Sequence, residues 1–450
     1  MGEVMRFRPI LAALMALLSL AAPAHAVLRV DINTGIQQPM PIAVPAFAAQ
    51  AVAQTPAGST TDLGRQVAEV ISNDLASTGL FRVVDPAAFT TTVAFGDVGK
   101  PQFPNWRTVA AQALVTGSVT ANGDGSVTVG CYLYDVFSEE ELARQGFTTQ
   151  PQFWRRAAHK CADAVYSRLT GETGYFDSRI VYVSETGPKI ARIKRLAIMD
   201  QDGANHRFLT NGQSLVLTPR FAPNQQTIAY MSFAGNRPRV YVYNIGTGRQ
   251  ELVLDAPNMT FAPRFSPDGG SLVISMAVGG NTDIYRLDLS SRRLTRLTSS
   301  PGIDTAASYS PDGSRIVFES DRGGTQQLYV MNADGSGQQR ISFGDGRYAT
   351  PVWSPRGDLI AFTRIGGGKF QIGVMRPDGG GERLLTDSWQ DEGPTWSPNG
   401  RVIMFFRTGQ SSRTASGRAD LWSVDLTGVN ERSLKTPLDG SDPAWSPLLP

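Results

Sequence analysis

Histidine is scarce in this chain of 450 residues, which has three. Beyond the first 26 residues only His159 and His206 remain, and neither falls in a spacing typical of metal ligands. No G-x-S-x-G nucleophile elbow and no phosphate-binding glycine loop occurs. These absences argue against a metalloenzyme, a serine hydrolase and a nucleotide-binding enzyme. We therefore expect no catalytic residues, no metal and no cofactor, although an ion in a channel of the fold, such as calcium, stays open.

Charge is also sparse. Charged residues make up 18% of the chain, the formal net charge is +2, and no block of lysine and arginine occurs. An electrostatic nucleic-acid binder needs a strong basic patch. We therefore expect no nucleic-acid partner.

Long apolar runs are limited to one, at residues 10–22. Two arginines precede this run, and the small-residue sequence A-H-A, ending at Ala26, follows it. The pattern is that of a secretory signal peptide over residues 1–26, cleaved between Ala26 and Val27. A membrane anchor is the alternative, but the run is too short to span a bilayer comfortably. The sequence thus predicts an exported protein with no direct membrane insertion.

Cysteine is limited to Cys131 and Cys161. Disulfides form in exported proteins, but spacing alone does not show whether two Cα atoms come within bonding range. A disulfide and a pair of buried thiols both remain open.

One short sequence motif recurs six times along the chain. The dipeptide Ser-Pro or Ala-Pro recurs in phrases such as "PRFSPDGGSLVISM" and "PVWSPRGDLIAFTR", with its prolines at 223, 267, 311, 355, 398 and 447. A period in the forties indicates a propeller or a helical solenoid. Each unit contains four strand-like segments joined by turn residues and lacks helical periodicity, which favours propeller blades. The aromatic residue before each Ser-Pro is expected to pack between blades.

The sixth copy stops after "PAWSP", which supplies only an innermost strand. The three missing strands stand at residues 180–185, 195–200 and 206–210. The end of the chain is therefore expected to pair with the start of the repeat region, which closes the ring and removes its open edges. We predict an α/β N-terminal domain over residues 27–175 and an all-β six-bladed propeller over residues 176–450, closed by the C-terminal strand.

The first domain contains two predicted helices. Residues 60–77 carry an apolar stripe, with Thr60 or Thr61 as the expected N-cap. Residues 150–170 form the second helix, which is expected to end at Gly171. The alternation of apolar residues over 28–32 predicts a strand at the edge of this domain.

Function is expected to lie in a surface. The loops that join one blade to the next gather at one end of a propeller, and arginine, methionine and aromatic residues in such loops are typical of protein interfaces. Local packing is the alternative for each. The candidates, expected just before the inner strands, are Arg220, Met259, Arg264, Thr305, Tyr348 and Glu392.

Acidic residues also occur in these loops. A pair of carboxylates could act as in a glycosidase, but solvated charges or partner contacts are the preferred interpretation. The residues concerned are Asp304, Asp391, Glu392 and Asp442.

The order of these parts resembles the TolB family, the periplasmic components of the Tol-Pal system of Gram-negative bacteria. The resemblance rests on the mature start "VLRVDINTG", the junction "LTGETGYFDSRIVYVSE" and the "WSPDG"-type repeats. It implies a monomeric, non-enzymatic adaptor that supports outer-membrane integrity and constriction during cell division. It also implies that Pal, the peptidoglycan-associated lipoprotein, binds at the mouth of the propeller.

The resemblance places a second partner, the C-terminal domain of TolA, on the mature N-terminus. The residues concerned are Val27, Leu28, Arg29, Val30, Asp31 and Ile32, within a segment that runs to Gln38. An edge strand that detaches could add to a partner's sheet. Two other classes stay open: a propeller enzyme acting on glycans or lactones in the periplasm, and a purely structural envelope protein.

Overall fold

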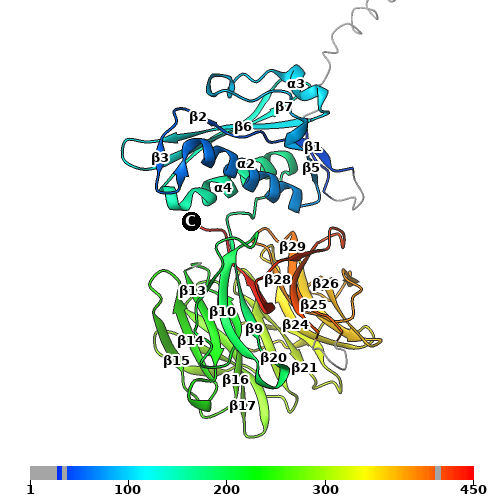
Figure 1. The fold of residues 1–450 in the computed structure, drawn as a ribbon. Coiled ribbons are helices and arrows are strands. Elements are labelled where there is room, and N and C mark those ends of the chain that lie inside the picture. The colour runs from blue at the N-terminus through cyan, green and yellow to red at the C-terminus, as the bar shows by residue number, and fades with distance from the viewer. Residues whose placement is uncertain (1–27, 33–37, 225, 411–416) are drawn as a thin grey trace, which may run out of the picture.

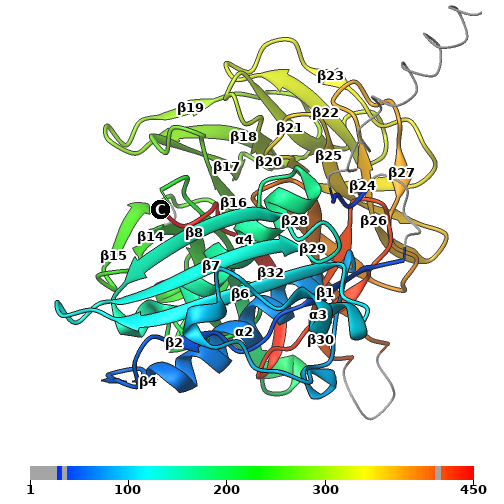
Figure 2. The ribbon, with the colours of Figure 1, turned by 90° about the horizontal axis from the view of Figure 1, so that it is seen from above.

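The chain folds into an α/β domain and a β-propeller, which are stacked on one another (Figure 1). The structure, a computed structural model, describes residues 28–32, 38–224, 226–410 and 417–450. The predicted signal peptide and its cleavage site at Ala26 and Val27 lie outside these residues. Figure 2, viewed from above, shows the α/β domain lying over the propeller ring.

The α/β domain has one main sheet, in which the strand order is β5-β1-β6-β7-β8. β1 is parallel to both of its neighbours, whereas β6, β7 and β8 are antiparallel. The strands of the domain are β1 (Met40–Ala43), β2 (Ala48–Ala49), β3 (Gln54–Thr55), β4 (Gly58–Ser59), β5 (Phe81–Val83), β6 (Ala113–Ala121), β7 (Val127–Asp135) and β8 (Glu141–Thr149).

Two long helices lie between this sheet and the propeller (Figure 1). The α-helices are α2 (Thr60–Ser77), α3 (Phe103–Thr108) and α4 (Trp154–Thr170). The expected N-cap of α2 was wrong by one residue, because the Ser59 hydroxyl accepts the hydrogen bond from the Asp62 N–H. The predicted end of α4 is confirmed: Gly171 adopts φ 78°, a left-handed conformation that glycine adopts without strain.

The propeller has six four-stranded blades, as predicted. Each blade is given from its innermost strand outwards. The first blade is β32 (Asp439–Trp445), β9 (Arg179–Thr186), β10 (Ile193–Asp200) and β11 (Arg207–Phe208); the second is β12 (Val216–Phe221), β13 (Thr227–Ser232), β14 (Arg239–Asn244) and β15 (Gln250–Leu254); the third is β16 (Thr260–Phe265), β17 (Ser271–Val278), β18 (Asn281–Asp288) and β19 (Leu294–Arg296). The fourth blade is β20 (Asp304–Tyr309), β21 (Arg315–Ser320), β22 (Gln327–Asn332) and β23 (Gln339–Arg340); the fifth is β24 (Arg347–Trp353), β25 (Ile360–Gly366), β26 (Lys369–Met375) and β27 (Arg383–Leu384); the sixth is β28 (Asp391–Trp396), β29 (Val402–Thr408), β30 (Ala419–Asp425) and β31 (Arg432–Leu434). The 3-10 helices are η1 (Pro86–Ala88), η2 (Phe95–Asp97), η3 (Pro151–Phe153), η4 (Lys189–Ala191) and η5 (Ala234–Asn236).

The C-terminal strand closes the ring, which confirms the prediction from the broken sixth repeat. β32 pairs with β9 in antiparallel register, with Trp445 opposite Ile180. The aromatic residues before the Ser-Pro turns are buried in the later blades, as Trp353, Trp396 and Trp445 show. The Trp396 indole N–H donates to the Val352 carbonyl of the preceding blade at 3.0 Å, so this ring packs between blades as expected.

A bulge interrupts each inner strand at the same place. The register shifts between Leu217 and Arg220 in β12, and equivalent shifts occur in the other five inner strands. A residue with positive φ stands at every bulge: Thr218, Ala262, Ala306, Thr350, Gly393 and Asp442. Since a bulge bends its strand and increases the local twist, the repeat bends all six inner strands alike.

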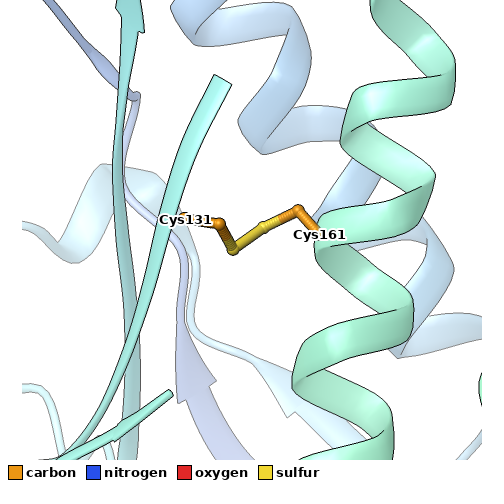
Figure 3. The surroundings of a disulfide bond; sticks show 2 residues. All are labelled: Cys131 and Cys161. Atoms are coloured by element: carbon orange, nitrogen blue, oxygen red, sulfur yellow. A yellow bond between two sulfur atoms is a disulfide. The ribbon is translucent and has the colours of Figure 1, made fainter. Parts of the chain in front are cut away.

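A disulfide joins Cys131 in β7 to Cys161 in α4, which answers the question that spacing left open (Figure 3). The two Cα atoms are 6.0 Å apart, and the bond closes 30 residues of chain. Both cysteines are buried in the core between the sheet and the helices. The bond therefore ties the sheet to the helix layer that faces the propeller.

Candidate protein interface

The propeller channel has two different ends. The connections from an outer strand to the next inner strand, together with the hairpins between second and third strands, lie at the end away from the α/β domain, here called the mouth face (Figure 1). The turns that follow the inner strands lie at the opposite end, here called the domain face. There Asn399 donates to the Thr173 carbonyl at 2.7 Å, and Arg356 forms an ion pair with Glu172.

The mouth face carries a ring of exposed apolar side chains. Large fractions of Ile190 (97%), Phe343 (72%) and Trp389 (52%) are exposed. Among the described residues, the large apolar side chains exposed on this face are Ile190, Ile193, Leu215, Met259, Val278, Ile303, Phe343 and Trp389. Exposed apolar groups gathered on one face mark an interaction surface. Ile190 and Phe343 were not predicted from the sequence. The available signal was an apolar residue beside glycine or proline, in the β9–β10 hairpin for Ile190 and in the connection from β23 to β24 for Phe343.

Buried ion pairs hold the loops of the mouth face in place. Arg322 donates to the Asp304 carboxylate at 2.7 Å, and Arg407 binds Asp391 through two hydrogen bonds of 2.6 and 2.8 Å. Both carboxylates are fully buried. The bidentate pair of Arg407 with Asp391 fixes geometry as well as charge. Arginine thus engages two of the four acids considered for a glycosidase pair.

Three of the predicted interface residues support the mouth loops from within. Thr305, Tyr348 and Glu392 are each the second residue of an inner strand, not the residue before it. Tyr348 is buried, and its hydroxyl donates to Glu382 Oε1 at 2.7 Å. Burial raises the pKa of this tyrosine. Met259 differs from these three, since it precedes its strand and is exposed.

Thr305 is buried as well, and Glu392 is half-buried. The Thr305 hydroxyl donates to the buried Glu319 carboxylate. Glu392 accepts from the Gln390 side-chain amide at 2.6 Å. Burial raises the pKa of the Glu392 carboxyl.

The expected position of Arg220 and Arg264 was wrong. Each is the last residue but one of its inner strand, β12 and β16. An inner strand crosses the propeller at about 3.3 Å per residue, so these side chains lie about 10 Å further along the channel than the second residues. They line a cavity of about 480 Å³ at the domain face. The error arose because the sequence shows where a repeat recurs but not where its strand begins.

The described part of the N-terminal segment, residues 28–32, forms no strand. The predicted edge strand was therefore wrong for these residues. The Val30 N–H donates to the Leu169 carbonyl at 2.8 Å, and the Arg401 guanidinium donates to the Ile32 carbonyl. Arg401 also binds Asp425 at 2.8 Å. The segment thus bridges α4 and the propeller, and Val27 lies outside the described residues.

A buried polar cluster joins the two domains. His159 Nδ1 and the Gln201 side-chain amide both contact the Asp74 carboxylate, at 2.7 and 2.8 Å. Burial alone would lower the pKa of His159, but the carboxylate of Asp74 and, beyond it, those of Asp202 and Asp200 raise it to about 9. The cluster links α2 and α4 to the turn after β10.

The same cluster has the only set of side chains in the described residues that could hold a metal ion. His159, Asp200 and Asp202 place one ligand atom each within 4.8 Å of one another. Arg155, however, forms ion pairs with both aspartates. A guanidinium therefore already takes the place of a cation beside these carboxylates.

None of the helices in the described part of the chain is long and apolar enough to cross a membrane.

Comparison with known proteins gives one consistent result. The family model of the TolB amino-terminal domain matches residues 28–142, and that of the TolB beta propeller domain matches residues 166–449. The chain is 68% identical to the Tol-Pal system protein TolB of Zymomonas mobilis over 424 residues, which cover 94% of this chain and 91% of that protein. It is 69% identical to the protein of that name from Rhizorhabdus wittichii over 446 residues, 99% of this chain and 100% of the relative.

A solved structure agrees with these relatives. The crystal structure of TolB from Acinetobacter baumannii superposes with a TM-score of 0.80 at 29% identity, over 93% of this chain and 100% of that one.

Proposed function

The chain belongs to the TolB family of the Tol-Pal system, and from this premise we propose that it is a monomeric periplasmic adaptor without enzymatic activity. It binds Pal through the mouth face and the C-terminal domain of TolA through its N-terminal segment. In this role it supports outer-membrane integrity and constriction during cell division.

The ring of exposed apolar side chains on the mouth face is the observation that carries the proposal. In the part of the chain that the structure describes, eight large apolar residues are exposed at the end of the propeller opposite the α/β domain. The bidentate pair of Arg407 with Asp391 holds the loops beneath them. A pre-ordered apolar surface loses little conformational entropy on binding, which favours affinity for a folded partner.

Calorimetry with the periplasmic domain of Pal from the same organism tests this docking surface. We expect Trp389→Ala and Phe343→Ala each to weaken Pal binding by at least about tenfold, because buried aromatic anchors dominate interface energies. Leu252→Ala is the matched control, since Leu252 is an exposed apolar residue on the outer strand β15, away from the mouth face. Equal affinities for all variants would refute the assignment of Pal to this face.

The N-terminal segment supports the second half of the proposal. Residues 28–32 contact α4 through one backbone hydrogen bond and contact the propeller through the Arg401 guanidinium. A segment that docks on its own protein and also binds a partner creates a coupled equilibrium between the two states. TolA is the partner that captures the released form.

Deletion of residues 27–38 tests this role. We expect the deletion to abolish binding of the TolA C-terminal domain and to change the affinity for Pal. A finer test is Arg401→Gln, which removes the contact with the segment and should increase the affinity for TolA. Arg293→Gln is the control, because Arg293 is an exposed arginine in the turn after β18. TolA binding that survives the deletion would contradict the proposal.

A further inference from the structure

One position in the six inner strands differs between blades in a way that packing does not explain. This position, the last but one of each strand, lines the channel at the domain face. Two neighbouring blades place arginine there, and the other four place small or uncharged residues. In blade order from β12, the residues are Arg220, Arg264, Ser308, Val352, Thr395 and Ala444.

Neither arginine has an acidic partner. Within the described residues, Arg264 makes no side-chain hydrogen bond and no ion pair, and Arg220 donates only to the carbonyl of its neighbour Pro219, at 2.7 Å. Asp442 attracts Arg220 from a distance, but its carboxylate faces the Thr218 N–H. Desolvation lowers the pKa of both arginines, and repulsion from Arg220 adds to the effect on Arg264. Two neighbouring cations without a counter-ion are costly in such a site.

The cavity between them is large enough for a ligand. Its volume is about 480 Å³, and Arg220 and Arg264 are the only charged residues among those that line it in the described chain. Prolines and aromatic rings supply much of the remaining wall. The chain does not fill this site with its own C-terminus, because the main-chain oxygen of Pro450 accepts a hydrogen bond from Arg156 instead.

We propose that the domain-face end of the channel binds a small oxyanion, a phosphate or a carboxylate, between Arg220 and Arg264. Guanidinium groups present parallel N–H donors that match the two oxygens of such anions. The anion would cancel the repulsion between the two arginines, and the partly enclosed site strengthens each charge-assisted hydrogen bond. The site lies at the opposite end of the channel from the mouth face and is independent of the Pal surface.

Thermal unfolding with added inorganic phosphate, at millimolar concentrations and constant ionic strength, tests the site. We expect the Tm of the mature chain to rise and to saturate. Arg264→Gln and Arg220→Gln should each raise the apparent Kd for phosphate by at least about tenfold. The control Arg293→Gln removes the same charge from an exposed turn and should respond as the unmodified chain does. A parallel titration with malonate distinguishes a phosphate from a dicarboxylate, and saturation by either one supports an oxyanion site.

A second readout comes from the protein without added anion. Arg264→Gln removes an unpaired cation from the cavity, so we expect it to unfold at a higher temperature than the unmodified chain, whereas Arg293→Gln should not. The proposal is overturned if neither anion gives saturable stabilisation, or if phosphate and malonate stabilise all four proteins equally.

Discussion

Removal of the Cys131–Cys161 disulfide should loosen the α/β domain selectively. The bond joins β7 to α4 and closes a segment of 30 residues. In the chain-entropy model, a cross-link stabilises a fold because it restricts the unfolded state, by an amount that grows with the logarithm of the closed length. For 30 residues the model gives about 3.6 kcal/mol at 25 °C. The buried sulfur atoms add little to this figure, because alanine at both positions loses only a small apolar volume.

Hydrogen exchange of the mature chain, followed by mass spectrometry, measures the effect within the intact protein. A loss of about 3.6 kcal/mol corresponds to exchange a few hundred-fold faster for the most protected amides of β7 and α4. Peptides from the fourth blade, β20 to β23, serve as the internal control and should keep their protection. The variants are Cys131→Ala, Cys161→Ala and the pair together.

Each single substitution breaks the same bond, so each should cost nearly as much as the double substitution. Acceleration below about tenfold in β7 and α4 would refute the reasoning from loop length. Equal acceleration in the propeller peptides would show that the two domains unfold as one unit. Additive effects of the two single substitutions would mean that the lost packing, and not the cross-link, dominates.

Three further perturbations test the packing and the buried charges. The pKa of His159 is raised from 6.5 to about 9 beside Asp74, so its contribution to stability is complete below pH 6.5 and is lost as the pH rises through 9. The midpoint of urea unfolding should therefore fall over that pH window. His159→Gln should remove this dependence of the midpoint on pH. Gly117→Ala would place a Cβ atom 2.0 Å from the Phe47 ring, so we expect a loss of about 1–3 kcal/mol, and an unchanged Tm would contradict this packing. Arg407→Ala leaves a fully buried carboxylate unpaired, which should cost about 3–5 kcal/mol in thermal unfolding, whereas a loss below about 1 kcal/mol would show that water replaces the arginine.

The propeller could be predicted because the repeated motif forms its turns through local interactions. In the turn after β16, the Asp268 carboxylate accepts from the Gly270 N–H at 2.9 Å and from the Ser266 hydroxyl. Gly269 adopts φ 72° there. All of these partners lie within five residues, so the turn chemistry is visible in the sequence. Once the six copies of the repeated motif are counted, the number of blades and the closure by the last strand follow.

The candidate interface was less predictable because burial depends on distant partners. Tyr348 lies near the start of the inner strand β24, but its side chain is buried, and its hydroxyl donates to Glu382, which is 34 residues later in the chain. Arg220 and Arg264 were assigned to the wrong end of the channel because the repeated motif does not show how long a strand is or in which direction it crosses the propeller. The pairing of β1 with β5 and β6 likewise brings together segments far apart in the chain. Such contacts depend on the whole fold and not on any single window of residues.

Closure of the ring by β32 determines when the propeller can complete its folding. β9 cannot acquire its inner neighbour until the residues of β32, Asp439–Trp445, have been synthesised. Until then the first blade is incomplete, and the edge of β9 is open to pairing with other chains. A chain with this topology therefore reaches its complete native state only after β32 is free to pair with β9. Synthesis of β32 and closure of the ring thus depend on the same few residues.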